Sequence, residues 1–240
     1  FVEFNDFIEQ CYQSIEQIKK AADTIGVLIG SPSRNPEKKG KDLFNAAFFL
    51  YEQKIVAEIH KTLLPTYDVF DEYRYFEPAY EWNIIEFKGK KLAVTICEDI
   101  WNLGDNPLYR ICPMDELMKH QPDVMLNISA SPFDYTHVED RKAIVKLNVQ
   151  KYKLPMLYCN CVGIVCEIVT SNVVAVVVLR NKKRVRRPHV CERRESSFLF
   201  SEGEASPTAT WSENSAMLKG NFYLRLSALD HHHNQTFRTA

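Results

Sequence analysis

Apolar residues that recur at steps of three and four predict amphipathic helices in this chain. In residues 5–22 the apolar positions fall at this spacing, with Asn5 in place to be the N-cap: Phe7, Ile8, Cys11, Ile15, Ile18 and Ala22. A second helix is predicted near 138–152, where one face carries Val138, Val145, Val149 and Tyr152. A third is predicted near 107–120, because a proline stands at its start.

Short apolar runs between turn residues predict buried strands. One is "TIGVLIGSP", which Gly30 and Pro32 should close, and "LFNAAFFLYEQKIVAEIHK" predicts two strands around Glu52-Gln53. "WNIIEFKGKKLAVTI" predicts a hairpin that turns at Lys88-Gly89, followed later by strands in "DVMLNIS" and "LPMLYCNCVGI". We expect "LLPTYDVFDEYRYFEP" to be a loop. Strands that alternate with helices indicate a layered α/β domain.

The last part of the chain has a different pattern. Residues 180–194 hold eight Lys or Arg and a single acid, and the turn-rich segment that follows shows little periodicity. We interpret the basic run as a solvated or disordered face. An RNA or anionic-surface patch is the less favoured alternative, because no aromatic residues interleave with the charges. The histidines at 231–233 are interpreted as an exposed tract rather than a metal site.

Composition narrows the class of protein. The chain has 240 residues, 45% of them hydrophobic, enough for one large domain with a substantial core or for two small domains. Its net charge of −1 predicts no nucleic-acid or membrane partner. No apolar run reaches the length of a membrane span. Seven cysteines, an odd number, fit a reducing compartment, so a cytoplasmic location is expected. The C-x-C-x₄-C spacing that ends at Cys166 lacks the paired C-x₂-C of a zinc ribbon, so we expect buried thiols and no metal.

One stretch, "KKLAVTICEDIWN", could carry chemistry. The apolar run from Leu92 to Ile96 leads directly into Cys97, which two carboxylates and a tryptophan follow. Nucleophilic catalysis by cysteine needs a nearby cation that favours the thiolate. Lys61, which follows the predicted strand "KIVAEIH", is the candidate cation. The residues alone therefore predict an α/β enzyme with a candidate cysteine nucleophile, and an inert core thiol is the alternative.

Three segments in order, "HKTLLPTYDVFDEYRYF", "KLAVTICEDIW" and "VMLNISASPF", resemble the nitrilase (carbon–nitrogen hydrolase) superfamily, and within it the glutaminase domain of glutamine-dependent NAD synthetases. The resemblance runs from about residue 1 to 163. It implies a four-layer α-β-β-α sandwich over residues 1–165, truncated at its start. It also implies a divergent or poorly ordered segment over 166–240, and the absence of the family's ATP-binding synthetase domain.

The resemblance assigns roles to single residues. Cys97 matches the nucleophile, Lys61 matches the lysine that holds the substrate oxyanion and favours the thiolate, and Glu72 matches the glutamate that orients the lysine. Positions that line the glutamine pocket in the family are Tyr67, Glu98, Trp101 and Ser131. A carboxylate at Glu98 suits the α-ammonium of the substrate. His137 stands where family members carry Arg or Lys near the glutamine carboxylate, so that contact would depend on pH.

The resemblance implies that the chain hydrolyses glutamine through a cysteine thioester and supplies ammonia for the amidation of deamido-NAD. The amide step would need no cofactor, whereas ATP and Mg²⁺ belong to the absent domain. The expected partners are glutamine, the synthetase domain of the same parent chain and further copies in a homo-oligomer. The family's proton-shuttling glutamate lies upstream of the first residue here, so we expect this chain to be weakly active or inactive. The alternatives are a stand-alone amidase of the superfamily and a catalytically dead interaction module.

Overall fold

A computed structural model describes residues 2–37, 39–67, 70–131 and 137–161, with the side chains of residues 137 and 138 left out. Beyond them it describes the backbone of six short strands, at 163–165, 168–170, 176–177, 198–199, 208–209 and 222–226. The basic run 180–194, the histidines 231–233 and Cys166 lie outside the described residues. The predictions made for them stay predictions.

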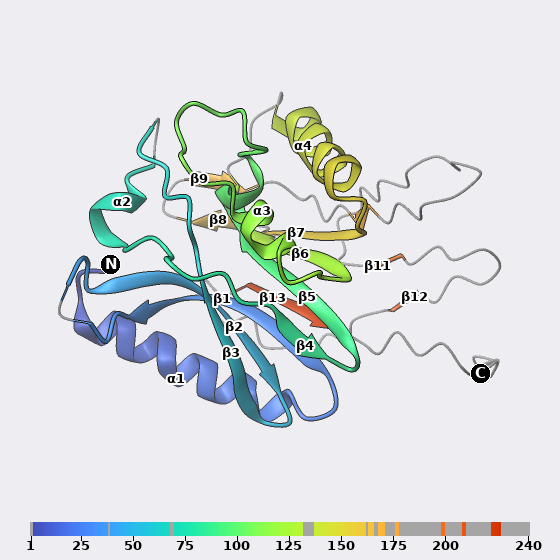
Figure 1. Ribbon diagram of the computed structural model, residues 1–240. Helices are drawn as coiled ribbons and strands as arrows, with labels where there is room; N and C mark the ends of the chain where they lie inside the picture. The colour runs from blue at the N-terminus through green and yellow to red at the C-terminus, as the bar shows by residue number, and fades with distance from the viewer. Residues whose placement is uncertain are drawn as a thin grey trace, which may run out of the picture.

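The first sheet is antiparallel and has the strand order β13-β1-β2-β3. Its strands are β1 (Gly26–Arg34), β2 (Leu43–Tyr51), β3 (Lys54–His60) and β13 (Phe222–Leu226). Helix α1 (Asn5–Ala21) runs along the outer face of this sheet (Figure 1). Alternate residues of β1 face opposite sides, since Val27 and Ile29 pack with Ile15 of α1 whereas Leu28 packs toward the second sheet.

The second sheet is mixed and has the strand order β10-β7-β6-β5-β4. Strands β5 (Lys90–Ile96), β6 (Val124–Ser129) and β7 (Met156–Asn160) are parallel neighbours. Strands β4 (Ile85–Phe87) and β10 (Val176–Val177) are its antiparallel edges. Helices α3 (Pro113–Met118) and α4 (His137–Tyr152) cover the outer face of this sheet.

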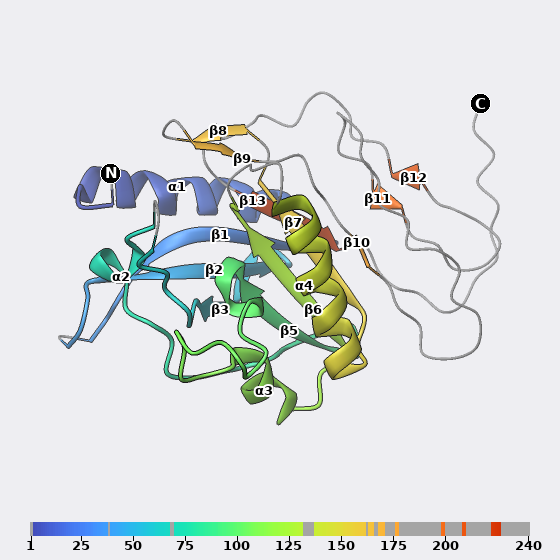
Figure 2. The ribbon, with the colours of Figure 1, turned by 90° about the horizontal axis from the view of Figure 1, so that it is seen from above.

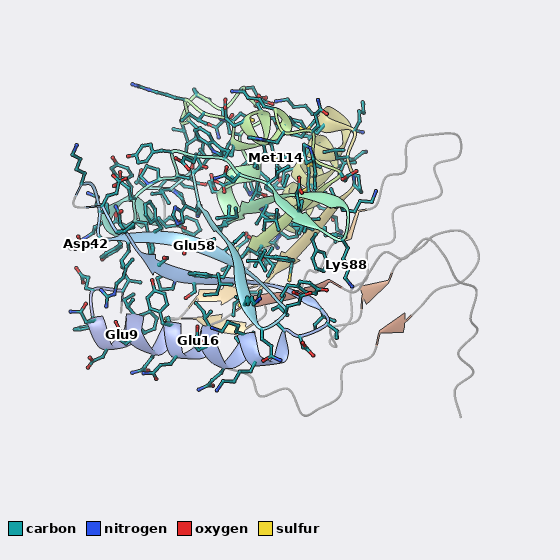
Figure 3. All side chains as sticks on the ribbon, turned by 60° about the horizontal axis from the view of Figure 1, so that its bottom comes forward. Glu9, Glu16, Asp42, Glu58, Lys88 and Met114 are labelled. Carbon is teal, nitrogen blue, oxygen red and sulfur yellow. The ribbon has the colours of Figure 1, made fainter. Side chains whose placement is uncertain are left out.

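The two sheets pack face to face, so the layers are helix, sheet, sheet and helix (Figure 2). The core between the sheets joins Leu28 and Phe49 of the first sheet to Val94, Leu126 and Ile128 of the second. The predicted α-β-β-α sandwich is confirmed. Figure 3 shows Met114 among the side chains around α3, while Glu9 and Glu16 lie on the solvent-facing side of α1.

The remaining elements are short. Helix α2 (Glu72–Tyr75) and the 3₁₀ turn η1 (Cys97–Ile100) lie in the connections that carry the candidate site residues. Strands β8 (Gly163–Val165) and β9 (Ile168–Thr170) form a hairpin, and β11 (Phe198–Leu199) pairs with β12 (Thr208–Ala209). Within the part of the chain that the structure describes, no helix has both the length and the apolarity to cross a bilayer.

Two predictions differ from the structure: the end of the first strand at Pro32, and the absence of a helix from the loop over residues 63–78. Strand β1 does not close at Gly30 and Pro32 but continues to Arg34. This is possible because β13 pairs only with residues 26–30, so the proline nitrogen faces an unpaired edge. The predicted loop before residue 78 contains the single turn α2, which is too short to show a helical period.

For two helices the predicted start was wrong. The helix expected over 107–120 begins only at Pro113, because the Asn102 side chain binds the amide of Gly104 and the carbonyl of Ile111 and holds the preceding segment as a loop. Asn5 is not the N-cap of α1, since the helix already begins there and its side chain accepts a hydrogen bond from Arg34.

Candidate active site

Lys61 follows the end of β3 and is fully buried. Its Nζ donates to both carboxylate oxygens of Glu72, each at 2.7 Å, and Asn45 also donates to this carboxylate at 3.3 Å. The backbone of Lys61 is fixed as well, since its N–H donates to the carbonyl of Asn45 and its carbonyl accepts from Ala79. The contact expected between Lys61 and Glu72 is therefore present.

The charge of Lys61 is stabilised by its surroundings. Burial alone would lower the pKa of this ammonium, but the negative charges of a Cys97 thiolate, Glu72 and Asp99 outweigh burial and raise it. A buried cation with a paired carboxylate stays charged at neutral pH, whereas an unpaired one would lose its proton. The site therefore holds a fixed positive charge beside Cys97.

Cys97 stands at the sharp turn where β5 passes into η1. Its φ is +46°, in the left-handed region that residues with a Cβ seldom adopt. Burial raises the pKa of the Cys97 thiol above its ordinary value, although the Lys61 ammonium and a hydrogen bond with Ser129 act to lower it. Lys61 favours the thiolate, as expected, whereas burial, the larger effect, favours the neutral thiol.

Glu98 lies next to the nucleophile candidate and is held by two tyrosines. The hydroxyls of Tyr67 and Tyr109 both donate to Oε1 of Glu98, at 2.7 and 2.9 Å. Burial and the negative charge of Glu98 raise the pKa of both tyrosines, so both remain proton donors. Glu98 is only 7% exposed, and a buried carboxylate of this kind suits a cationic group of a ligand.

A cleft of about 730 Å³ opens beside these tyrosines. Its walls come from the segment after β3, from the segment around α2 and from the loop before α3: Thr62, Leu63, Leu64, Thr66, Tyr67, Tyr73, Pro78, Ala79, Tyr80, Leu108, Tyr109, Arg110 and Ile111. The volume lies within the range of small-molecule sites. The mainly apolar wall with a few tyrosine hydroxyls is also typical of such sites.

Asp99 is buried and accepts three backbone hydrogen bonds. Its Oδ1 accepts from the amides of Thr62 and Leu63, at 3.0 and 2.8 Å, and its Oδ2 accepts from the amide of Ile96 at 3.0 Å. Burial raises the pKa of Asp99 to about 6, and the three amides act against that rise. One side chain thus binds the backbone on both sides of the site.

The other predicted pocket residues have different environments. Trp101 packs against the core under α3 and α4. Ser131 accepts a hydrogen bond from Arg141, and its own amide donates to Asn160. His137 is the first residue of α4, and its side chain lies outside the described residues. Of the predicted set, the structure brings together Lys61, Glu72, Cys97, Glu98 and Tyr67.

Sequence reasoning missed Tyr109, Asp99 and Ser129. Asp99 could have been singled out, because it stands two residues after Cys97 at the end of a buried strand. Tyr109 lies in an irregular loop with no pattern around it. Among the described residues, no group of three or more His, Cys, Asp or Glu side chains could hold a metal ion.

Known proteins similar in sequence to this chain include several glutamine-dependent NAD⁺ synthetases. The enzyme of Synechocystis sp. is 34% identical over 164 residues, which are 65% of this chain and 29% of that protein. The enzyme of Thermotoga maritima is 35% identical over 123 residues, 51% of this chain and 20% of that protein. The chain thus spans less than a third of the length of these curated relatives. No protein-family model matches it.

Solved structures share its fold. Glutamine-dependent NAD⁺ synthetase from Acinetobacter baumannii, in complex with ADP, superposes with a TM-score of 0.61 at 23% identity, over 70% of this chain and 30% of that one. An amidase from Nesterenkonia sp. AN1, with acrylamide added at its active-site cysteine, gives a TM-score of 0.57 at 17% identity, over 71% and 63% of the two chains.

The chain shares its fold with solved members of the nitrilase (carbon–nitrogen hydrolase) superfamily. Within it, the matched part of the chain resembles the N-terminal glutaminase domain of glutamine-dependent NAD⁺ synthetase.

Proposed function

We propose that the chain hydrolyses the side-chain amide of glutamine at Cys97 and releases ammonia for the synthesis of NAD⁺. The observation that carries the proposal is the fully buried Lys61, paired with Glu72 at 2.7 Å and electrostatically coupled to Cys97. A charged lysine held beside a thiol supports covalent catalysis on a carbonyl compound. The relatives named as glutamine-dependent NAD⁺ synthetases support the choice of substrate.

The reaction would use the groups in order. The Cys97 sulfur attacks the amide carbon of glutamine, and the Lys61 ammonium stabilises the negative oxygen that forms. The C–N bond breaks, the nitrogen leaves as ammonia with the thiol proton, and a γ-glutamyl thioester remains. Water then attacks the thioester, which releases glutamate and restores the thiol. Glu72 keeps its charge throughout and holds Lys61 in place.

Glu98 would select an amino acid rather than a simple amide. Its buried carboxylate, which Tyr67 and Tyr109 hold next to Cys97, would accept the α-ammonium of glutamine. His137 is our candidate for the α-carboxylate. Neither contact needs a metal or an organic cofactor. ATP and Mg²⁺ would be used by the synthetase domain of a parent enzyme, which would also receive the ammonia.

The test is to trap the thioester with hydroxylamine. We expect the chain, given L-glutamine and hydroxylamine, to form γ-glutamyl hydroxamate, and intact mass to show a γ-glutamyl adduct on Cys97. The Cys97→Ala variant should give neither product, whereas Cys11→Ala, which alters a buried thiol of α1, should give both.

Two other outcomes would replace the proposal. Equal reaction of Cys97 with propionamide and with glutamine would favour a stand-alone amidase, since a simple amide has no α-ammonium for Glu98. Failure of Cys97 to react with glutamine or any simple amide, in a folded chain, would favour a catalytically inactive interaction module.

A further inference from the structure

Lys61 and Cys97 come from different sheets, and among the described residues no strand of one sheet pairs with a strand of the other. Lys61 follows β3 of the first sheet, and Cys97 follows β5 of the second. Packing of apolar side chains sets the distance between sheets loosely, whereas a thiol and an ammonium must lie within a few ångströms for their charges to matter. Something more directional is needed to fix them.

Asp99 supplies that directional link. Oδ1 binds the amides of Thr62 and Leu63, directly after Lys61, and Oδ2 binds the amide of Ile96, directly before Cys97. The carboxylate is 3% exposed, so these bonds form away from water, where charge-assisted hydrogen bonds are strong. We propose that Asp99 is a positioning residue, which holds the Lys61 segment against the Cys97 turn and so fixes the ammonium beside the thiol.

The strained backbone at Cys97 fits this role. A left-handed conformation at a residue with a Cβ costs about 1–2 kcal/mol and persists only where its surroundings impose it. The Ile96 amide is bound by Asp99 just before the strained residue, and the Asn127 side chain lies 3.5 Å from the Cys97 carbonyl just after it. Asp99 therefore acts on the orientation of Cys97 as well as on the place of Lys61.

The charged groups around Asp99 decide whether the pKa of Cys97 rises or falls when Asp99 is changed. Lys61 faces Asp99 and is coupled in turn to Cys97 and Glu72, and Glu98 also acts on Cys97. Removing the Asp99 charge alone would favour the thiolate, and loosening the site to admit water would do so too. Loss of the Lys61 ammonium from its place has the opposite effect and raises the apparent pKa of Cys97. Only a positioning role predicts a rise.

The experiment measures alkylation of Cys97 by iodoacetamide between pH 6 and 10, with peptide mapping to separate it from the other thiols. In Asp99→Asn we expect the apparent pKa of Cys97 to rise by about 0.5–1, a part of the 1–3 that an opposite charge at close range supplies. Lys61→Met should raise it also, and the double variant should rise no further than Lys61→Met alone, since Asp99 acts through Lys61.

The control is Asp123→Asn. Asp123 likewise accepts a backbone hydrogen bond, from the amide of Lys91 at 2.8 Å, but at the other end of β5 and on the surface. The apparent pKa of Cys97 should stay unchanged there. A fall or no change in Asp99→Asn, or full additivity with Lys61→Met, would overturn the proposal. The inference rests on the proposed function of the site. Alkylation of Cys97 needs no turnover, however, so the experiment distinguishes loss of positioning from loss of glutaminase activity.

A second measurement covers the case in which Asp99→Asn does not fold. In the unaltered chain at pH 7, hydrogen exchange should show the amides of Thr62, Leu63 and Ile96 protected together, because all three donate to the one buried carboxylate. Rapid exchange of the Thr62 and Leu63 amides at pH 7 would overturn the proposal.

Discussion

At the scale of single residues, every carboxylate described beside Cys97 already has a partner. Glu72 is bound to Lys61, Glu98 to two tyrosine hydroxyls and Asp99 to three amides. Each of these contacts stabilises a negative charge whose burial without a partner would be unfavourable. The arrangement suits the recognition and polarisation of a substrate amide, and it leaves proton transfer as the demanding step.

The paired tyrosines on Glu98 lead to a prediction about affinity. Tyr109→Phe removes one of the two hydrogen bonds to Oε1 and leaves the ring in the cleft wall. We expect the Kd for L-glutamine, measured by NMR titration in a Cys97→Ala background, to rise about fivefold, the size of one lost hydrogen bond of about 1 kcal/mol. Tyr73→Phe, elsewhere in the same wall, should leave the Kd unchanged, and an equal effect of both changes would refute the assignment.

The pKa of Asp99 leads to a prediction about stability. Since it is raised in the folded chain to about 6, the folded state binds a proton more tightly than the unfolded state between about pH 4 and 6. The stability that this proton supplies is complete below about pH 4 and is lost as the pH rises through 6, by about 3 kcal/mol in all. In urea denaturation, the stability of Asp99→Asn relative to the unaltered chain should therefore improve from pH 4.5 to 7.5. A difference that does not vary with pH would contradict it.

Site residues could be predicted from the sequence where a polar or reactive residue comes directly after a predicted strand. Lys61 and Cys97 each come directly after an apolar run, so their positions could be predicted before their contacts were known. The contacts of Asp99 lie 36 and 37 residues away, and Tyr109 reaches Glu98 from an irregular loop. Such pairings depend on how the two sheets pack, which no local pattern records.

At the scale of elements, two hairpins make similar turns from different residues. The turn between β2 and β3 has Glu52 and Gln53 at φ +50° and +56°, and the turn between β4 and β5 has Lys88 and Gly89 at +48° and +73°. Turns with two residues of positive φ favour Asn followed by Gly. The first hairpin therefore carries strain that its neighbours impose, through bonds from both amides to Ala22 and Asp23.

Relief of that strain should stabilise the chain. Glu52 and Gln53 are exposed, so the double substitution Glu52→Asn and Gln53→Gly changes little besides the turn. We expect the free energy of unfolding in urea to rise by about 1 kcal/mol. Gly89→Ala is the matched control, because open space surrounds it and only its φ is unfavourable. It should lower the stability by about 1 kcal/mol, and effects of the same sign in both turns would refute the argument.

The strands could be predicted more fully than the short helices, for a physical reason. β5 and β6 are buried on both faces, and such strands appear as continuous apolar runs with Gly or polar residues at their ends. Helix α2 has four residues, so no helical period can appear in it, and α3 keeps only six of the positions first predicted. The side chain of Asn102 holds the segment before α3 as a loop through hydrogen bonds, and helix propensity does not describe such bonds.

At the scale of the whole molecule, the site lies where the ends of two sheets meet. The first sheet supplies Lys61 and the second supplies Cys97. The cleft walled by the segment around α2 and the loop before α3 opens beside Thr62, the residue after Lys61. Each sheet is covered by its own helices on the outer face, so the sandwich can keep the two strand ends in register. The proposed chemistry would thus depend on the packing of both sheets, so a stable sandwich would be a condition for activity.

The whole arrangement predicts that this chain forms the thioester faster than it completes turnover. Cys97 is nucleophilic enough to attack once its proton is lost, but Glu72, Glu98 and Asp99 are all engaged and none is free to carry protons to ammonia or from water. Without general acid–base catalysis, turnover should be slower by about 10²–10⁴-fold than in a full-length glutamine-dependent NAD⁺ synthetase. The measurement is ammonia release from L-glutamine, followed with quenched intact mass to detect γ-glutamyl Cys97. Turnover within about tenfold of the full-length enzyme would show that another residue serves as the base, and thioester that never accumulates during slow turnover would place the difficult step at the attack instead.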